Sequence, residues 1–261
     1  MAKMKVNDFL NTLKKMTRVK TLYVMGGWGF PLTTENKKRA FTQPYNCRSD
    51  RKVKINAASS DTFAFDCCGI VKSTLWDWNG DASKKNGGAS YASNGVPDYD
   101  AKEFMFSGCT EQSRDFSKIE PGEFLWLDGH CGVYLGDGLA IESTPKWKDG
   151  VQITAVANIG KKKGYESRTW TYHGHLKYVD YSGVQPTPTP TEYVVGKDYK
   201  VICKDTLNVR ADASVSARKI TELVPQTTIT CREVKKDKSG NTWIKIDGWI
   251  AAKYNGETYV G

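Results

Sequence analysis

The chain has 261 residues, and its 38 Lys and Arg against 29 Asp and Glu give a formal net charge of +9. With 39% hydrophobic and 26% charged residues, the composition is that of a globular protein and excludes a wholly disordered or fibrous chain. No run of about 18 consecutive apolar residues occurs, so we expect no membrane insertion.

The first residues carry charges but no long apolar core and no small-residue cleavage site. This start predicts a chain made in the cytoplasm without a signal peptide. Directly after it, Val6–Met16 has apolar residues at helical spacing and predicts an amphipathic first helix that packs on a core.

The stretch Phe65–Gly80 also has apolar residues at near-helical spacing, and it ends in Asn79-Gly80, a pair suited to a helix C-cap. Cys67 and Cys68 therefore lie at the N-terminus of a predicted helix. The helix dipole and the free N–H groups there stabilise a thiolate and lower the pKa of a thiol, which favours a nucleophile at neutral pH. A cysteine is otherwise most often a small buried hydrophobic residue.

Three apolar runs follow within Gly122–Ser143, separated by glycine-containing turns, and predict a three-stranded meander. With a three-residue loop at Gly136–Gly138, Tyr134 pairs with Ala140, and His130 and Glu142 become diagonal neighbours on one face. A two-residue turn would place Glu142 on the other face, so this prediction depends on the loop length.

Alternating Pro and Thr residues at 182–192 predict an extended linker. We expect a catalytic domain at 1–181 and a second domain at 193–261. The first has 26 basic and 20 acidic residues (+6), the linker has one acidic residue, and the second has 12 basic and 8 acidic residues (+4). Neither domain has a dense basic run, so we expect no nucleic-acid partner.

The tail at 193–261 contains short β-branched runs separated by turns, which predicts a small antiparallel barrel. It resembles the bacterial SH3-like domains that tether enzymes to cell walls. Leu207–Arg210, Trp243 and Gly248–Ile250 carry this resemblance.

The seven cysteines contain no C-x-x-C pair, and the chain has only three histidines. We therefore expect no metal site and no cofactor. The residues instead combine into Cys67 as nucleophile, His130 as general base and acid, and Glu142 as the group that orients the imidazole.

Three motifs at these positions resemble the NlpC-type papain-like cysteine peptidases of bacterial cell walls and, more broadly, phage endolysins of that fold. They are Tyr23-Val-Met-Gly-Gly27, Phe65-Asp-Cys-Cys-Gly69 and Gly129-His-Cys-Gly-Val-Tyr-Leu-Gly-Asp-Gly138. The resemblance implies an α+β, papain-like catalytic domain with the same three catalytic residues. It also implies that Tyr23 lies near the thiolate and that Asp66 helps to bind the substrate peptide.

The sequence departs from the family pattern at three places. Cys68 stands where the family has a serine. The subsite for the substrate peptide can therefore differ from that of the family, and two thiols are candidates for the nucleophile. Glu142 stands where a histidine is common, with Thr144 as a second candidate for orienting His130. The segment between Gly27 and Phe65 is longer than usual, and it either shapes a different cleft or forms a surface insertion.

Together these features predict a monomeric, endolysin-like peptidoglycan hydrolase that binds the cell wall through both domains. We expect it to cut an amide bond in stem or cross-bridge peptides as an endopeptidase, with N-acetylmuramoyl-L-alanine amidase as the alternative. Two hypotheses about a different function stay open: a non-catalytic wall-binding protein, and an acyltransferase or thioesterase on the same fold. The sequence does not identify the bond, the source or the wall ligand.

Overall fold

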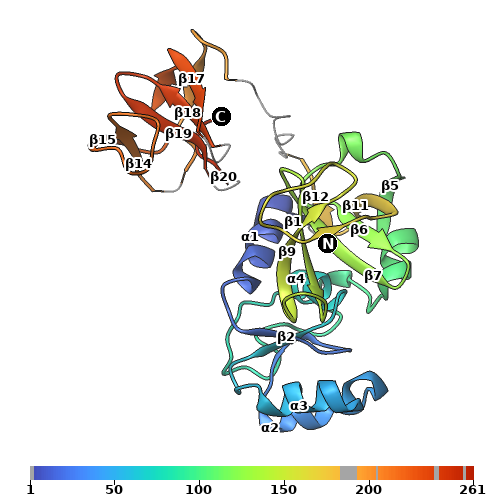
Figure 1. Ribbon diagram of the computed structural model, residues 1–261. Coiled ribbons are helices and arrows are strands. Elements are labelled where there is room, and N and C mark those ends of the chain that lie inside the picture. Colours follow the sequence, from blue (N-terminus) through green and yellow to red (C-terminus); the bar gives the residue numbers. More distant parts are fainter. Residues whose placement is uncertain (1–2, 183–192, 204, 238–240, 255–256) are drawn as a thin grey trace. The chain divides into compact units, whose positions relative to one another are not determined.

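The structure, a computed structural model, describes residues 3–182, 193–203, 205–237, 241–254 and 257–261 (Figure 1). Contacts within the chain divide it into two compact units, residues 1–187 and 188–261. The division falls inside the linker predicted at 182–192, of which residues 183–192 lie outside the described ranges. Each unit has a hydrophobic core of its own.

The larger sheet of the N-terminal unit has seven strands in the spatial order β10-β9-β8-β7-β6-β11-β5. In chain order they are β5 (Cys109–Ser113), β6 (Phe124–Leu127), β7 (His130–Gly136), β8 (Leu139–Thr144), β9 (Gly150–Val156), β10 (Ser167–Arg168) and β11 (Tyr172–Leu176). The predicted meander is thus confirmed as the adjacent strands β6, β7 and β8. All six residues of β8 are buried, which fits a strand inside the sheet with both faces covered.

Two smaller pairings complete the strands of this unit. A three-stranded sheet in the order β2-β4-β3 consists of β2 (Thr21–Tyr23), β4 (Phe63–Phe65) and β3 (Trp28–Pro31). β1 (Met4–Lys5) pairs in parallel with β12 (Val179–Asp180) and so joins the two ends of the unit.

The helices of this unit are short. They are α1 (Val6–Met16), α2 (Thr34–Ala40), α3 (Ser49–Ala57), α4 (Gly69–Leu75), α5 (Ala101–Glu103), the π-helical turn η3 (Phe104–Gly108) and the 3-10 turns η1 (Pro44–Cys47), η2 (Ser93–Gly95) and η4 (Phe116–Lys118). The amphipathic first helix is confirmed at α1, whose apolar residues are buried along one face. The mixed α+β class predicted for this domain is confirmed as well.

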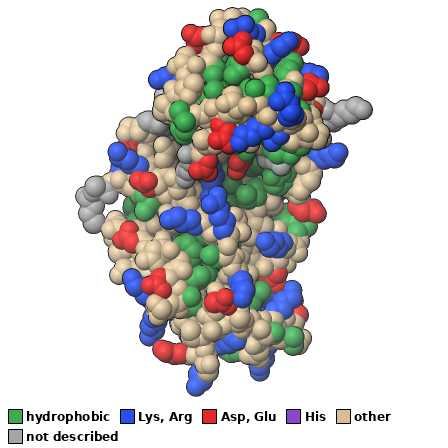
Figure 2. Space-filling model, turned by 90° about the vertical axis from the view of Figure 1, so that its left-hand side faces the viewer, with side chains coloured by type: hydrophobic (Ala, Val, Ile, Leu, Met, Phe, Trp, Pro, Cys, Tyr) green, Lys and Arg blue, Asp and Glu red, His purple; other side chains and the backbone are tan. Residues whose placement is uncertain are grey.

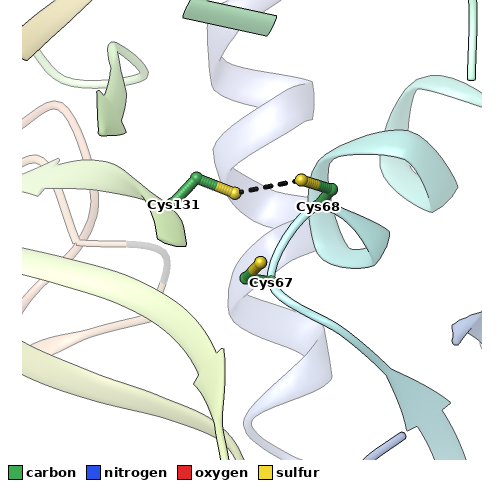
Figure 3. Close-up of side chains that lie close together, drawn as sticks. All are labelled: Cys67, Cys68 and Cys131. Carbon is green, nitrogen blue, oxygen red and sulfur yellow. Dashed lines mark hydrogen bonds between the residues drawn. The ribbon is translucent and has the colours of Figure 1, made fainter. Parts of the chain in front are cut away.

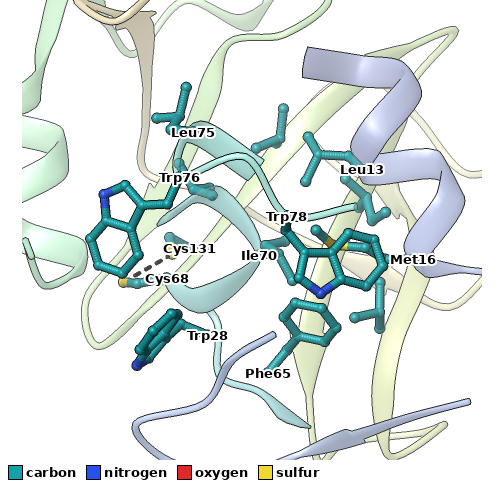
Figure 4. Packing of buried hydrophobic residues seen from close by; sticks show 14 of the residues in the cluster. Leu13, Met16, Trp28, Phe65, Cys68, Ile70, Leu75, Trp76, Trp78 and Cys131 are labelled. Atoms are coloured by element: carbon teal, nitrogen blue, oxygen red, sulfur yellow. Dashed lines mark hydrogen bonds between the residues drawn. The ribbon is translucent and has the colours of Figure 1, made fainter. Parts of the chain in front are cut away.

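The core joins α1 to the segment that carries the two adjacent cysteines (Figure 4). Leu13 and Met16 of α1 belong to the same buried cluster as Phe65, Ile70 and Trp78. The packing of α1 therefore fixes the position of α4 from the side opposite to solvent.

The C-terminal end of α4 differs from the prediction. The helix ends at Leu75, before the expected Asn79-Gly80 cap, because Asp77 adopts a left-handed conformation with φ of 66°. The N–H of Trp78 donates to the carbonyl of Ser73 at 2.9 Å, and the N–H of Asp77 donates to Thr74 at 3.3 Å. This is a Schellman motif with Asp in place of the usual glycine, and such a substitution is hard to recognise in a sequence.

At its N-terminal end, α4 is held by Asp66. Its carboxylate accepts from the N–H of Gly69 at 2.6 Å and from the N–H of Gly26 at 2.8 Å. Gly69 also lies so close to Gly27 that a Cβ would come within 1.8 Å of the Gly27 carbonyl oxygen. The absence of a side chain at Gly69 is therefore a condition for this loop to pack against the helix.

The C-terminal unit consists of strands. They are β13 (Asp198–Lys200), β14 (Leu207–Arg210), β15 (Lys219–Leu223), β16 (Thr228–Thr230), β17 (Glu233–Lys236), β18 (Thr242–Lys245), β19 (Trp249–Tyr254) and β20 (Glu257–Thr258). β15-β14-β19-β18-β17 form one sheet with β20 on β19, and β13 pairs with β16. The antiparallel strands agree with the prediction, but among the described residues the pairings do not close into a barrel. No helix in the described ranges is long and apolar enough to cross a membrane.

Replacing Gly69 by Ala tests the close approach of the loop to α4. The new Cβ meets backbone rather than a movable side chain, so we expect Gly69→Ala to lower the free energy of unfolding by about 3 kcal/mol. Urea unfolding measures this change. Lys14→Ala, on the exposed face of α1, is the control and should stay within about 0.5 kcal/mol of the wild type. Equal stability of all three proteins would contradict the packing described.

Candidate active site

Cys67 lies in the short connection between β4 and α4, one residue before the helix N-cap Cys68. It is only partly buried, whereas Cys68 is 6% exposed and points into the core. The fold therefore distinguishes the two candidate thiols of the sequence, because Cys67 is the more exposed of the two residues.

His130 and Glu142 meet across β7 and β8 as the sequence predicts. Tyr134 pairs with Ala140, and His130 Nε2 lies 2.7 Å from Glu142 Oε2. The loop itself differs from the prediction, since Gly136 pairs with Leu139 across a two-residue turn. A β-bulge between Tyr134 and Gly136 adds the missing residue and restores the predicted register.

Glu142 is fully buried and is held by several donors. Arg168 Nε donates to both carboxylate oxygens, at 3.0 and 2.8 Å, and the Thr154 hydroxyl donates to Oε1 at 2.6 Å. Burial alone would raise the pKa of Glu142, but the bonds from His130 and Arg168 outweigh it and lower the pKa. The carboxylate therefore stays ionised next to the imidazole.

His130 lies between this carboxylate and Cys67. Its ring stacks on Trp170 with 5.7 Å between centroids and 12° between planes. Burial lowers the pKa of His130, but interactions with the Cys67 thiolate and with Glu142 outweigh it, and the pKa is raised. Because Nε2 binds Glu142, Nδ1 is the ring nitrogen that remains for Cys67.

The thiol of Cys67 is stabilised as a thiolate. Hydrogen bonds from Cys131 and Cys68 lower its pKa most, burial opposes them, and His130 lowers it further. The pKa of Cys67 consequently lies well below its ordinary value. A thiolate and an imidazolium side by side can attack an electrophilic carbon and then protonate a leaving group.

The residues predicted to bind substrate occupy different surroundings. Tyr23 is mostly buried, its ring meets that of Tyr45 edge-on at 5.9 Å, and burial together with the Cys67 charge raises its pKa. Asp66 has a pKa raised to about 7 by burial and by the nearby Cys67. Both carboxylate oxygens of Asp66 accept backbone N–H groups, and Cys68 lies in the core. Asp66 and Cys68 therefore support the start of α4. That Tyr23, Asp66 and Cys68 contact substrate stays a prediction.

Thr144, the second candidate for orienting His130, is engaged elsewhere. Its hydroxyl accepts from the N–H of Lys146 at 3.2 Å. The orienting contact belongs to Glu142.

The long segment between Gly27 and Phe65 supports the loop after β2. Asn46 is fully buried; its side-chain oxygen accepts from the N–H of Met25 at 3.0 Å, and its nitrogen donates to the Met25 carbonyl at 2.9 Å. Arg51, also buried, forms an ion pair with Asp149 and donates to the carbonyl of Tyr23. The segment is thus packed into the unit and is more than a surface insertion.

The sequence did not reveal Thr154, Arg168 and Trp170 as parts of the site. Arg168 lies on β10, which pairs in parallel with β9, and nothing in its local sequence shows which strand it will join. Alternation along β9 could have placed Thr154 near Glu142, because Thr154 pairs with Ala140 on the neighbouring strand.

Two groups of potential ligand atoms occur among the described residues, although the sequence predicted none. The sulfur atoms of Cys67, Cys68 and Cys131 lie within 4.8 Å of one another, and so do side-chain atoms of Glu120, Glu123 and His175. In the second group, Nε2 of His175 lies 3.3 Å from a carboxylate oxygen of Glu120 and 3.4 Å from one of Glu123, so these side chains have polar partners without a metal.

No protein-family model matches the chain, and neither does any curated protein. Among solved structures, the match to the crystal structure of Ly7917 covers 99% of this chain and 97% of the Ly7917 chain, at 13% sequence identity and a TM-score of 0.30. Ly7917 with the hydrolyzing product of MDP covers 98% and 97%, at 13% identity and a TM-score of 0.29. Likeness at this level carries no argument about the fold or the function.

The reactivity of Cys67 towards iodoacetamide tests the lowered pKa. The alkylation rate of a thiol with a pKa of about 8.5 falls about tenfold per pH unit in the acid direction. We expect the rate at Cys67, followed by peptide mass spectrometry, to change less than about threefold between pH 8 and pH 6. Free cysteine in the same solution is the control, and a parallel fall of both rates would contradict the assignment.

Glu142→Gln tests the charge that supports His130. The substitution removes the carboxylate charge but keeps an oxygen near the ring, so the pKa of His130 should fall. Imidazole NMR titration measures it. Glu111→Gln is the matched control because Glu111 lies 3.6 Å from His175 and is largely exposed. An unchanged titration of His130 in Glu142→Gln would contradict the geometry.

Proposed function

We propose that the chain is a peptidoglycan hydrolase, resembling the NlpC-type papain-like peptidases, that cuts an amide bond in stem or cross-bridge peptides. The observation that carries the proposal is the arrangement of three side chains in which His130 lies between Cys67 and Glu142. It combines an accessible thiol of lowered pKa, an imidazole of raised pKa and a buried carboxylate 2.7 Å from that imidazole. This is the order of groups that nucleophilic acyl transfer requires.

The first half of the reaction forms an acyl-enzyme. The Cys67 sulfur attacks the amide carbon, and the carbonyl electron pair moves to oxygen, where backbone N–H groups such as that of Cys67 would stabilise the charge. As the carbon–nitrogen bond breaks, His130 Nδ1 gives its proton to the leaving amine. A thioester of Cys67 and a new amino terminus result.

The second half releases the acyl group. His130, now neutral, takes a proton from water while the water oxygen attacks the thioester carbon, and the Cys67 thiolate leaves. Glu142 keeps the ring oriented and stabilises the imidazolium, which is present in the resting site and forms again when His130 takes the proton from water. None of these steps needs a metal or a cofactor.

We further propose that the C-terminal unit is an SH3-like domain that binds the cell wall. A shallow hollow of about 550 Å³ on this unit is lined by Ile220, Trp249 and several charged residues. Lys235 and Lys245 lie over the Trp249 ring at 5.6 and 5.7 Å from its centroid. A hollow lined by apolar residues and by charges of both signs suits a peptide that carries free amino and carboxyl groups.

The distribution of charge favours an anionic cell wall over a nucleic acid as the partner. On the face shown in Figure 2, Lys and Arg side chains are scattered among acidic and hydrophobic ones. The net charge of +9 attracts the protein to an anionic wall, and the scattered charges on this face form no continuous basic track for a phosphate backbone.

Cys67→Ala tests the nucleophile directly. We expect it to reduce the clearing of purified cell walls by at least about 10³-fold, because the thioester cannot form. Cys68→Ser should retain lysis, since the serine hydroxyl can replace the thiol as a hydrogen-bond donor to Cys67. The Cys67→Ala protein should still sediment with walls through the C-terminal unit, and an unchanged circular dichroism spectrum should show that its N-terminal unit is folded. Equal loss in both variants, or undiminished lysis without Cys67, would contradict the proposal.

A further inference from the structure

A third thiol lies at the candidate site, and the proposed reaction does not use it. Cys131 follows His130 on β7 and is fully buried, and its sulfur lies 3.4 Å from that of Cys68 (Figure 3). Cys67, Cys68 and Cys131, here called the thiol cluster, have their sulfur atoms within 4.8 Å of one another. The fold therefore places one accessible and two buried thiols in a single group.

We propose that the thiol cluster is an oxidation relay in which hydrogen peroxide oxidises Cys67 and the oxidation is passed on to a disulfide between Cys68 and Cys131. The outcome protects Cys67, because its thiolate is released again. The relay needs no substrate of the proposed hydrolase, so it can hold or fail independently of that function.

The first two steps consume the peroxide. The Cys67 thiolate attacks one peroxide oxygen, the oxygen–oxygen bond breaks, and a sulfenic acid and hydroxide form. The Cys131 thiol then displaces water from the sulfenic acid, and a Cys67–Cys131 disulfide forms. Cys67 is the entry point because it is the most exposed member of the thiol cluster.

The third step is a thiol–disulfide exchange. Cys68 loses its proton and attacks the Cys131 sulfur, the Cys67–Cys131 bond breaks, and Cys67 leaves as thiolate. The released proton neutralises the hydroxide of the first step. In total, one peroxide and two thiols give one disulfide and two waters.

Acidity sets the direction of the exchange. Burial and contact with the Cys67 thiolate raise the pKa of Cys131. The bond with Cys131 lowers the pKa of Cys68, but the nearby Cys67 thiolate and burial outweigh it, so this pKa is raised too. The thiol of lowest pKa is the best leaving group, so the thiolate should return to Cys67.

Geometry requires Cys131 as the intermediate. Cys67 and Cys68 are neighbours across a trans peptide, with Cα atoms about 3.8 Å apart, which is shorter than the 4.4–6.8 Å typical of disulfides. A direct bond between them is therefore unfavourable. Cys68 and Cys131 need to approach by little more than about 1 Å to reach the bonded distance.

Peptide mass spectrometry of the full-length protein tests the relay. The protein is treated with one equivalent of hydrogen peroxide, free thiols are blocked with iodoacetamide, and fragmentation between residues 67 and 68 separates the two adjacent cysteines. In the wild type we expect a Cys68–Cys131 disulfide and an alkylated Cys67. In Cys68→Ser the reaction should stop at the Cys67–Cys131 disulfide.

Cys131→Ser and Cys109→Ser complete the design. Without Cys131, excess peroxide should convert Cys67 to the sulfinic acid at least about tenfold faster than in the wild type. Cys109 is equally buried but lies on β5, outside the thiol cluster, so Cys109→Ser should behave as the wild type. A Cys67–Cys131 disulfide that persists in the wild type, or equally fast sulfinic acid formation with and without Cys131, would overturn the proposal.

Discussion

The buried carboxylate of Glu142 is the charge on which the candidate site depends. A fully buried carboxylate without partners would be strongly destabilising, and here Arg168, Thr154 and His130 all bind it. Arg168 holds the carboxylate ionised, the carboxylate favours the imidazolium of His130, and the imidazolium favours the thiolate of Cys67. Cys131 and Cys68 lower the pKa of Cys67 most, and the further contribution of His130 depends on an arginine from β10 that lies far from Cys67 in the chain.

The backbone that presents these groups is held by equally specific contacts. Asp66 joins the start of α4 to the loop at Gly26, and Gly69 permits that loop to approach the helix. Asn46 binds the same loop from the long segment before β4. The side chains around Cys67 thus serve mainly to position it, and the accessible thiol remains the reactive group of its neighbourhood.

Much of this arrangement could be predicted from the sequence, because local patterns carry it. Apolar spacing predicts α1, and period-two alternation places His130 beside Glu142. The loop shows the limit: a two-residue turn with a β-bulge gives the same register as the predicted three-residue loop, and only the structure distinguishes them. Arg168 and the buried Cys131 could not be assigned to the site, because the local sequence does not show that β10 pairs with β9 or that Cys131 packs against Cys68 at the start of α4. The early end of α4 escaped prediction because Asp77 takes the left-handed position that glycine usually occupies.

Mass spectrometry of peptidoglycan fragments tests the central proposal most directly, since it identifies the bond that is cut. Digestion of purified walls by the wild-type protein should yield fragments with new amino and carboxyl termini at one amide bond, each cut adding one water. The position of the new amino terminus distinguishes stem, cross-bridge and muramoyl amides. Fragments with new reducing sugar ends, or the same amide fragments from Cys67→Ala, would contradict the account.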